Sequence, residues 1–165
     1  VNGNVNVVQC NIEMPNGNDN YGINWSGTPE GGVLNIKDTE ISAYQCVNIY
    51  GLNRTVSIEN CKLNAVNEHN DNYTGACVTV FEKASATVSI NNCAMTTKSA
   101  ANKAPEYGVA FGSVLGQTIY ANVTIEKCSL NGETFSVNKN YAFGYIDNNM
   151  TNGSITIDGN RVVSK

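Results

Sequence analysis

The single histidine of the chain lies in a polar segment whose residue types suit acid–base chemistry. The segment reads Asn67-Glu68-His69-Asn70-Asp71-Asn72. Glu68, His69 and Asp71 offer two carboxylates and an imidazole, which act as general acids and bases in enzymes. The same composition suits a solvent-exposed loop in a chain with 27 asparagines. We favour the loop interpretation, because the sequence identifies no partner groups that would complete a catalytic site.

Two aspartates occupy equivalent places before a repeated tyrosine and could supply oxygen ligands to Ca²⁺. Asp19 precedes Tyr21, and Asp71 precedes Tyr73. The spacing of these residues matches neither an EF-hand nor a calcium-binding nonapeptide repeat. We therefore expect no bound cofactor, with Ca²⁺ as the one candidate.

A second pair of carboxylates, Glu126 and Asp158, stands at equivalent places in the repeat described below. On adjacent rungs of a solenoid, two carboxyl groups could have split pKa values and perform acid–base chemistry on sugars. The alternative is a pair of surface charges with Lys127 nearby, and this is the interpretation that we favour.

Aromatic residues recur where successive units of the repeat are joined. Tyrosine returns at positions 21, 44, 73, 107 and 141, and three of these tyrosines are followed four residues later by another aromatic residue. Facing outward, such rings would form a stacking platform for sugars, whereas facing inward they would fill a core. We favour the inward orientation for Trp25, Phe111 and Tyr145. The candidate ligand-binding residues are Trp25, Tyr73, Tyr107, Phe111, Tyr141 and Tyr145.

The elements that must position these residues follow from one internal repeat. Six stretches carry apolar or substituting residues at offsets 0, 2, 5 and 7, and their starts are 29, 22, 32, 35 and 32 residues apart. A period of this size is typical of solenoids. The stretches are Val5-Val7-Cys10-Ile12, Leu34-Ile36-Thr39-Ile41, Val56-Ile58-Cys61-Leu63, Val88-Ile90-Cys93-Met95, Val123-Ile125-Cys128-Leu130 and Ile155-Ile157-Asn160-Val162.

Each stretch reads as two short strands that meet at a corner. Apolar residues alternate with period two on both sides, and two intervening residues keep them inward only if the chain bends between them. Offset 4 is mostly asparagine, aspartate or glycine, which tolerate a left-handed backbone. With a third strand opened by the repeated tyrosine, we predict an all-β parallel solenoid of about six coils and three short sheets.

The repeat resembles the pectate-lyase-like right-handed parallel β-helix superfamily. The residues that carry the resemblance are Val-Ser-Ile-Glu-Asn-Cys-Lys-Leu at 56–63 and its copy at 88–95. The resemblance implies a right-handed coil and a ladder of stacked asparagines between the second and third sheets, matched by Asn60 and Asn92 but not by Asn160. It also implies a substrate groove over the first sheet, beside the tyrosine strands. The arginine and aspartate cluster of the lyases and the paired aspartates of the related hydrolases have no match in this chain.

The six cysteines allow two interpretations. Cys10, Cys61, Cys93 and Cys128 fill the slot that Thr39 and Asn160 fill elsewhere, which favours small, buried free thiols. Stacked strands lie about 4.8 Å apart, close enough for a disulfide. Cys61–Cys93 and Cys46–Cys77 pairs are therefore the alternative.

Composition narrows the function classes. The net charge is -4 and charged residues make up 15%, so we expect neither nucleic acid nor an anionic membrane as a partner. No apolar run approaches the roughly 20 residues that span a bilayer, so we also expect no membrane insertion.

We expect residues 1–165 to form one domain, a module of a larger secreted or cell-surface bacterial protein with flanking domains. We expect a non-catalytic module that binds polysaccharide or a cell-surface glycan, as an adhesin or surface scaffold. The alternatives are a polysaccharide lyase or glycoside hydrolase acting on an acidic or complex glycan, and a structural spacer of a tailspike or stalk.

Overall fold

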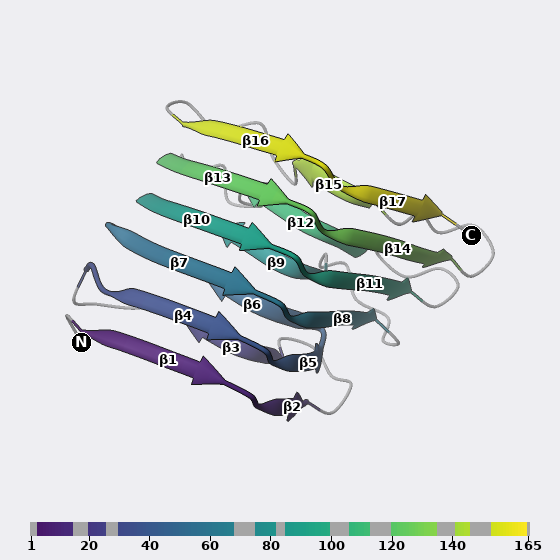
Figure 1. Ribbon diagram of the computed structural model, residues 1–165, viewed down its shortest axis with the longest axis horizontal. Helices are drawn as coiled ribbons and strands as arrows, with labels where there is room; N and C mark the ends of the chain where they lie inside the picture. Colours follow the sequence, from purple (N-terminus) through teal and green to yellow (C-terminus); the bar gives the residue numbers. More distant parts are fainter. Residues whose placement is uncertain are drawn as a thin grey trace.

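The computed structural model describes residues 3–14, 20–25, 30–67, 75–81, 85–99, 106–112, 120–134, 141–145 and 153–164. All regular structure in these ranges is β-strand (Figure 1). In the same part of the chain, no helix is long and apolar enough to cross a membrane.

The strands form three parallel sheets, which we call A, B and C. Sheet A holds β1 (Asn4–Val8), β4 (Val33–Lys37), β7 (Arg54–Glu59), β10 (Ser85–Asn91), β13 (Tyr120–Glu126) and β16 (Ser154–Asp158). Sheet B holds β2 (Asn11–Glu13), β5 (Glu40–Ala43), β8 (Lys62–Asn67), β11 (Ala94–Ser99), β14 (Ser129–Thr134) and β17 (Arg161–Ser164). Sheet C holds β3 (Tyr21–Trp25), β6 (Gln45–Ile49), β9 (Gly75–Phe81), β12 (Glu106–Gly112) and β15 (Tyr141–Tyr145).

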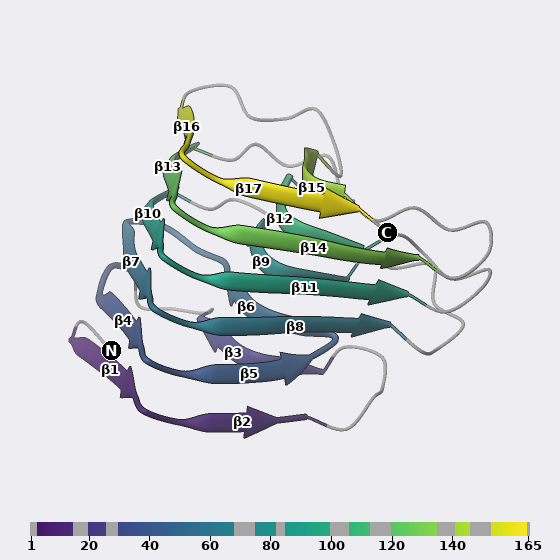
Figure 2. The same ribbon diagram turned by 45° about the vertical axis from the view of Figure 1, so that its right-hand side comes forward.

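The predicted fold class is confirmed. The described strands make five complete coils and two strands of a sixth. In Figure 1 the strands of sheets A and B run from left to right in front, the chain returns behind through sheet C, and each coil lies above the one before, as the turned view of Figure 2 also shows. This winding is right-handed.

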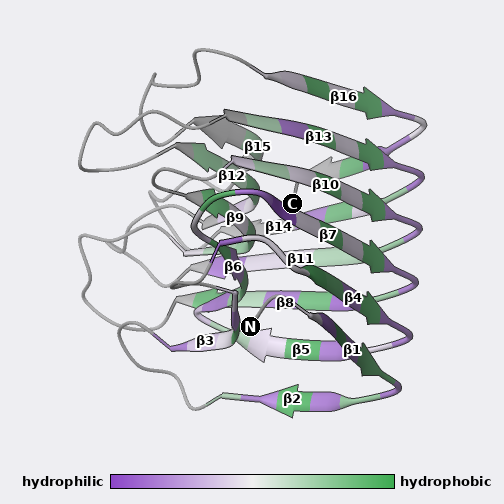
Figure 3. Cartoon of the chain, turned by 90° about the vertical axis from the view of Figure 1, so that its left-hand side faces the viewer, coloured by the Kyte–Doolittle hydropathy of each residue, from purple (hydrophilic) through white to green (hydrophobic). Residues whose placement is uncertain are grey.

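The register places equivalent residues of successive coils directly over one another. Val56, Val88 and Val123 are Cα partners across three neighbouring strands. Their side chains point inward and are buried, and hydrophobic and hydrophilic residues alternate along the strands (Figure 3). Full burial of a side chain of this size contributes about 1.5–3 kcal/mol, so the stacked core is the main source of stability.

The bend between sheets A and B is made by one residue per coil with a left-handed backbone. The residues at this position all have φ between 51° and 60°. The predicted corner is thus confirmed on all six coils, even where lysine or glutamine occupies it. The corner residues are Gln9, Asp38, Asn60, Asn92, Lys127 and Gly159.

Close packing between coils requires a glycine at one point of sheet C. A Cβ atom on Gly22 would meet a side-chain methyl of Ile41 and lie 2.8 Å from the carbonyl oxygen of Cys46. The carbonyl belongs to the backbone of β6 and cannot swing away. Gly22 therefore permits the close approach of β3 to its neighbours.

Candidate ligand-binding face

Several predicted site residues lie outside the described residues. These are Asp19, Glu68, His69, Asp71 and Tyr73. Their predicted roles in catalysis, Ca²⁺ binding or sugar stacking stay predictions. Within the described ranges, no group of three or more His, Cys, Asp or Glu side chains could hold a metal ion.

Glu126 and Asp158 are Cα partners on β13 and β16, so the predicted adjacency of these carboxylates is confirmed. Asp158 is exposed and Glu126 is half-buried on the outer side of sheet A. In the same row of the sheet, Lys37 Nζ lies 3.2 Å from Glu59 Oε2, with both side chains about half exposed. The row therefore forms a solvated, charged border, in which an ion pair contributes about 0–1 kcal/mol.

The inward orientation favoured for Phe111 is confirmed. This side chain is 2% exposed and belongs to the hydrophobic core, so it offers no stacking platform. Trp25 is half-buried and packs against the same core, with the guanidinium of Arg54 5.2 Å from the centre of its ring. Both side chains thus stabilise the solenoid instead of offering a free aromatic face.

Three further aromatic candidates lie on β12 and β15. Tyr107 is half-buried on β12. Tyr141 and Tyr145 are Cα partners of Tyr107 and Phe111 respectively. Tyr21, Tyr107 and Tyr141 occupy one row of sheet C, as the sequence predicts. The prediction is wrong on the second and third coils, where Gln45 and Ala76 hold this position in place of Tyr44 and Tyr73.

The outer row of sheet C is not an open groove at its centre. Asn24, Asn48, Thr79 and Ala110 are Cα partners at its outward positions. Asn48 is only 6% exposed, Thr79 and Ala110 are fully buried, and the Asn48 side-chain amide donates to Asn24 Oδ1 at 2.9 Å. The groove expected over the tyrosine strands is therefore absent from this row of described residues.

The corner between sheets A and B carries the predicted asparagine ladder. Asn92 Nδ2 donates to Asn60 Oδ1 at 2.7 Å, and Asn60 Nδ2 donates to Asp38 Oδ1 at 3.2 Å. All three side chains are exposed, so the ladder runs along the outside of the solenoid. Aspartate, which only accepts when ionised, ends the chain of donors.

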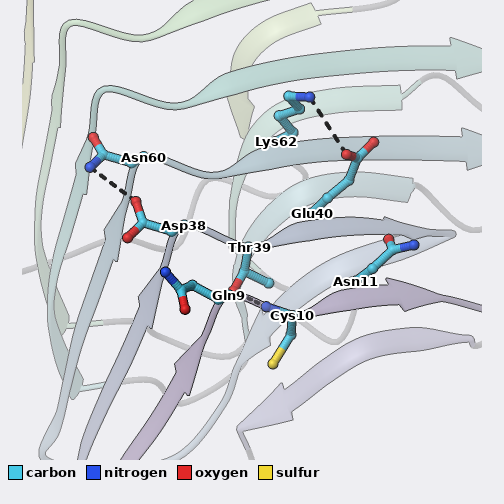
Figure 4. A pocket seen from close by; sticks show the side chains of 8 residues that line it. All are labelled: Gln9, Cys10, Asn11, Asp38, Thr39, Glu40, Asn60 and Lys62. Carbon is cyan, nitrogen blue, oxygen red and sulfur yellow. Dashed lines mark hydrogen bonds and ion pairs between the residues drawn. The ribbon is translucent and has the colours of Figure 1, made fainter.

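A shallow polar hollow opens at the lower end of this ladder (Figure 4). Across it, Lys62 Nζ lies 3.6 Å from Glu40 Oε2. The hollow presents amides, carboxylates and an ammonium group to solvent, which suits a polar ligand. Its lining residues are Gln9, Cys10, Asn11, Asp38, Thr39, Glu40, Asn60 and Lys62.

The stacked cysteines Cys61, Cys93 and Cys128 have a structural role. All six cysteines are free thiols, as favoured from the sequence, and five of them are buried. The Sγ atoms of Cys61, Cys93 and Cys128 each lie 3.2–3.3 Å from the carbonyl oxygen two residues earlier. Each also contacts a carbonyl of the coil below at 3.6–3.7 Å. Each S–H can donate to one of its two carbonyls at a time, and the nearer carbonyl also accepts a backbone N–H from the neighbouring coil.

The same role explains why threonine and asparagine replace cysteine in this slot. Thr39 Oγ1 donates to the Lys37 carbonyl at 2.9 Å, and Asn160 Nδ2 donates to the Ile125 carbonyl at 2.8 Å. The slot thus accepts a small side chain that can donate a hydrogen bond to the backbone.

Hydrogen bonding between the stacked thiols changes their acidity. The central thiol, Cys93, lowers the pKa of both Cys61 and Cys128 to about 7, because its S–H can donate to either thiolate. The same contacts raise the pKa of Cys93.

The most regular polar surface is the outer face of sheet A. Two rows of outward side chains cross its six strands in register, and all twelve are exposed or half-buried. Eleven of the twelve are serine, threonine or asparagine, and none is charged. We call them the uncharged rows: Asn4, Val33, Thr55, Thr87, Asn122 and Ser154 in one, and Asn6, Asn35, Ser57, Ser89, Thr124 and Thr156 in the other.

Sheet B also faces solvent, and charged residues recur at its outward positions, among them Glu13, Glu40, Lys62, Lys98 and Arg161. Its uncharged positions form one run of four, Ser42, Asn64, Thr96 and Asn131, whereas sheet A has two complete uncharged rows side by side. The apolar repeat predicts the inward positions only, so it does not identify the uncharged rows. The sequence does contain a signal for them, a recurring triplet of a polar, an aliphatic and a polar residue, as in Thr55–Ser57 and Thr87–Ser89.

No protein-family model, curated protein or solved structure matches this chain.

Proposed function

We propose that the protein is a non-catalytic, extracellular polysaccharide-binding module. The observation that carries this proposal is the pair of uncharged rows on sheet A. Serine and threonine hydroxyls and asparagine amides both donate and accept hydrogen bonds, as sugar hydroxyls do. A surface of these groups is therefore complementary to a ligand dense in hydroxyls.

The number of hydrogen-bonding side chains matters for affinity. Each hydrogen bond to a ligand replaces one to water and so contributes only about 0.5–1.5 kcal/mol to binding. Eleven such side chains on one face can engage several sugars at once. They are short, so ordering them costs little side-chain entropy compared with lysine, arginine or glutamate.

A binding role is favoured over catalysis because the adjacent carboxylates, Glu126 and Asp158, lie on the solvated border of sheet A. Their adjacency is also the one observation that favours the alternative, a glycoside hydrolase or polysaccharide lyase. As a finer classification of the solenoid, we propose the pectate-lyase-like superfamily, on the strength of the asparagine ladder at Asn60 and Asn92.

A glycan array probed with the purified chain tests the proposal. We expect binding to one or more polysaccharides, with no new reducing or unsaturated ends after prolonged incubation of each hit with the protein. New ends would instead identify an enzyme. No binding to any glycan, together with a stable trimer by light scattering, would identify a structural spacer.

A further inference from the structure

We infer that the ligand is an extended, uncharged glycan that lies across the strands of sheet A, parallel to the solenoid axis, with about one sugar residue per coil. This inference rests on the proposed function. It adds the class of glycan, its direction and the number of sugars that are bound.

The spacing of the strands in sheet A fits such a glycan. Neighbouring parallel strands lie about 4.8 Å apart, so the six strands of sheet A span five intervals, or about 24 Å. This interval is of the order of the advance per residue of an extended β-linked glycan, because one pyranose ring and its linking oxygen occupy about the same length. Successive sugars would therefore meet successive coils, and because alternate residues of a flat β-1,4-linked chain are turned over, equivalent hydroxyl groups would recur at every second coil.

The distance between the two uncharged rows also fits such a glycan. Their residues are two positions apart on each strand, which separates the rows by about 6.6 Å. A flat sugar ribbon projects hydroxyl groups along both of its edges. One ribbon lying between the rows can therefore use both, for example Thr87 on one side and Ser89 on the other.

The charges on the outer face of sheet A favour a neutral glycan. The uncharged rows hold no arginine or lysine to pair with a carboxylate or sulfate group. Their charged border carries Glu59, Glu126 and Asp158 against Lys37 alone, so its net charge is negative. An anionic glycan would be repelled there, whereas a neutral one would not.

Side chains of the uncharged rows are already ordered by hydrogen bonds to one another. Asn35 Nδ2 donates to Asn6 Oδ1 at 3.0 Å, and Ser154 Oγ donates to Asn122 Oδ1 at 3.0 Å. Threonine side chains are in addition stiff at χ1. Preordered groups lose little freedom on binding, which increases the affinity available from weak contacts.

A length series tests the inference. The probes are neutral β-1,4-linked gluco-, manno- and xylo-oligosaccharides from disaccharide to octasaccharide, with polyuronates of equal length beside them. For the best neutral series, we expect affinity by calorimetry to rise with chain length and to level off at about six residues. We expect the polyuronates to bind more weakly than the neutral chain of the same length.

Two matched variants locate the site. Ser89→Lys places a long charged side chain at the centre of the uncharged rows, and we expect it to weaken binding about tenfold or more. Thr96→Lys makes the same change on the outer side of sheet B in the same coil, and we expect less than a twofold effect. Thermal melting of both variants checks that each is folded.

Three kinds of result would overturn the inference. Affinity independent of length, tightest binding to polyuronates, or equal losses in the two variants would overturn it while leaving polysaccharide binding in place. Absence of binding to every glycan would overturn the proposed function as well. Self-association that Ser89→Lys abolishes would show that the face joins copies of this chain, which would also refute the inference.

Discussion

The corner ladder allows a prediction in which two substitutions at one residue separate the backbone from the side chain. Asn60 has a φ of 54° and takes part in two hydrogen bonds, as acceptor from Asn92 and as donor to Asp38. Asn60→Ala and Asn60→Gly both remove the two hydrogen bonds. Only alanine retains a Cβ atom in the left-handed conformation, which costs about 1–2 kcal/mol.

The expected magnitudes follow from these contacts. Because the side chains are exposed, water replaces each lost partner, and the two bonds together contribute about 1 kcal/mol. Asparagine carries the same Cβ atom and only tolerates this conformation better, so Asn60→Ala should lower the free energy of unfolding by about 1–2 kcal/mol. Asn60→Gly should lower it by less, about 0.5–1 kcal/mol, since glycine relieves the strain but makes the unfolded chain more flexible.

Urea unfolding followed by circular dichroism measures both values, and thermal melting should show a loss of about 2–8 °C for Asn60→Ala. Asn64 is the matched control, because it lies in β8 and its side chain donates to Ser42 Oγ at 3.1 Å. In a regular strand we expect the opposite order, so that Asn64→Gly lowers the free energy of unfolding more than Asn64→Ala does. If glycine proved as costly as alanine or costlier at Asn60, the argument from the left-handed corner would be refuted.

Three further outcomes are expected. In Cys93→Ala the pKa values of Cys61 and Cys128 should rise above about 7, whereas Cys93→Ser should keep them low because a hydroxyl still donates; ultraviolet thiolate absorbance against pH distinguishes the two. A lowered thiol pKa adds stability only above that pKa, so the stability of the native protein relative to Cys93→Ala should grow from pH 7 to pH 9. Below pH 7 only the pH-independent loss of the buried Cys93 side chain should remain. Phe111→Ala should cost about 3–5 kcal/mol in urea unfolding and leave glycan affinity unchanged, and the reverse pattern would contradict a core role. Gly22→Ala should cost more than about 2 kcal/mol, since its Cβ atom would collide with backbone, and a neutral result by the same assay would disprove that contact.

The solenoid could be predicted because its inward positions leave a repeated trace in the sequence. Apolar residues at offsets 0 and 2 must be followed by a bend before offsets 5 and 7 can also point inward. The bend occurs at offset 4 even at Lys127, whose residue type alone does not favour a left-handed backbone. Stacking on neighbouring corners therefore determines the conformation there more strongly than intrinsic propensity does.

The binding face could not be predicted in the same way, because coils differ in length by up to 13 residues. Outward residues such as Ser57, Ser89 and Thr124 become one row only when the register is known. The sequence shows them as isolated polar residues, each unremarkable in a half-exposed strand. Recurring aromatic residues are a more visible pattern and suggest sugar stacking, although Phe111 fills the core.

The contrast between the two exposed sheets is the strongest reason to seek a ligand on sheet A. Both sheets have the same parallel pairing, the same inward packing and an outward side in solvent. Folding and solubility therefore impose the same requirements on both, and both sheets carry outward charges that meet them, on sheet A in the border row. Sheet A nevertheless lacks charges over two complete adjacent rows, whereas sheet B lacks them only over the single run Ser42, Asn64, Thr96 and Asn131. A neutral ligand that needs short hydrogen-bonding groups at every coil would account for the difference, and Ser89→Lys compared with Thr96→Lys tests that account directly.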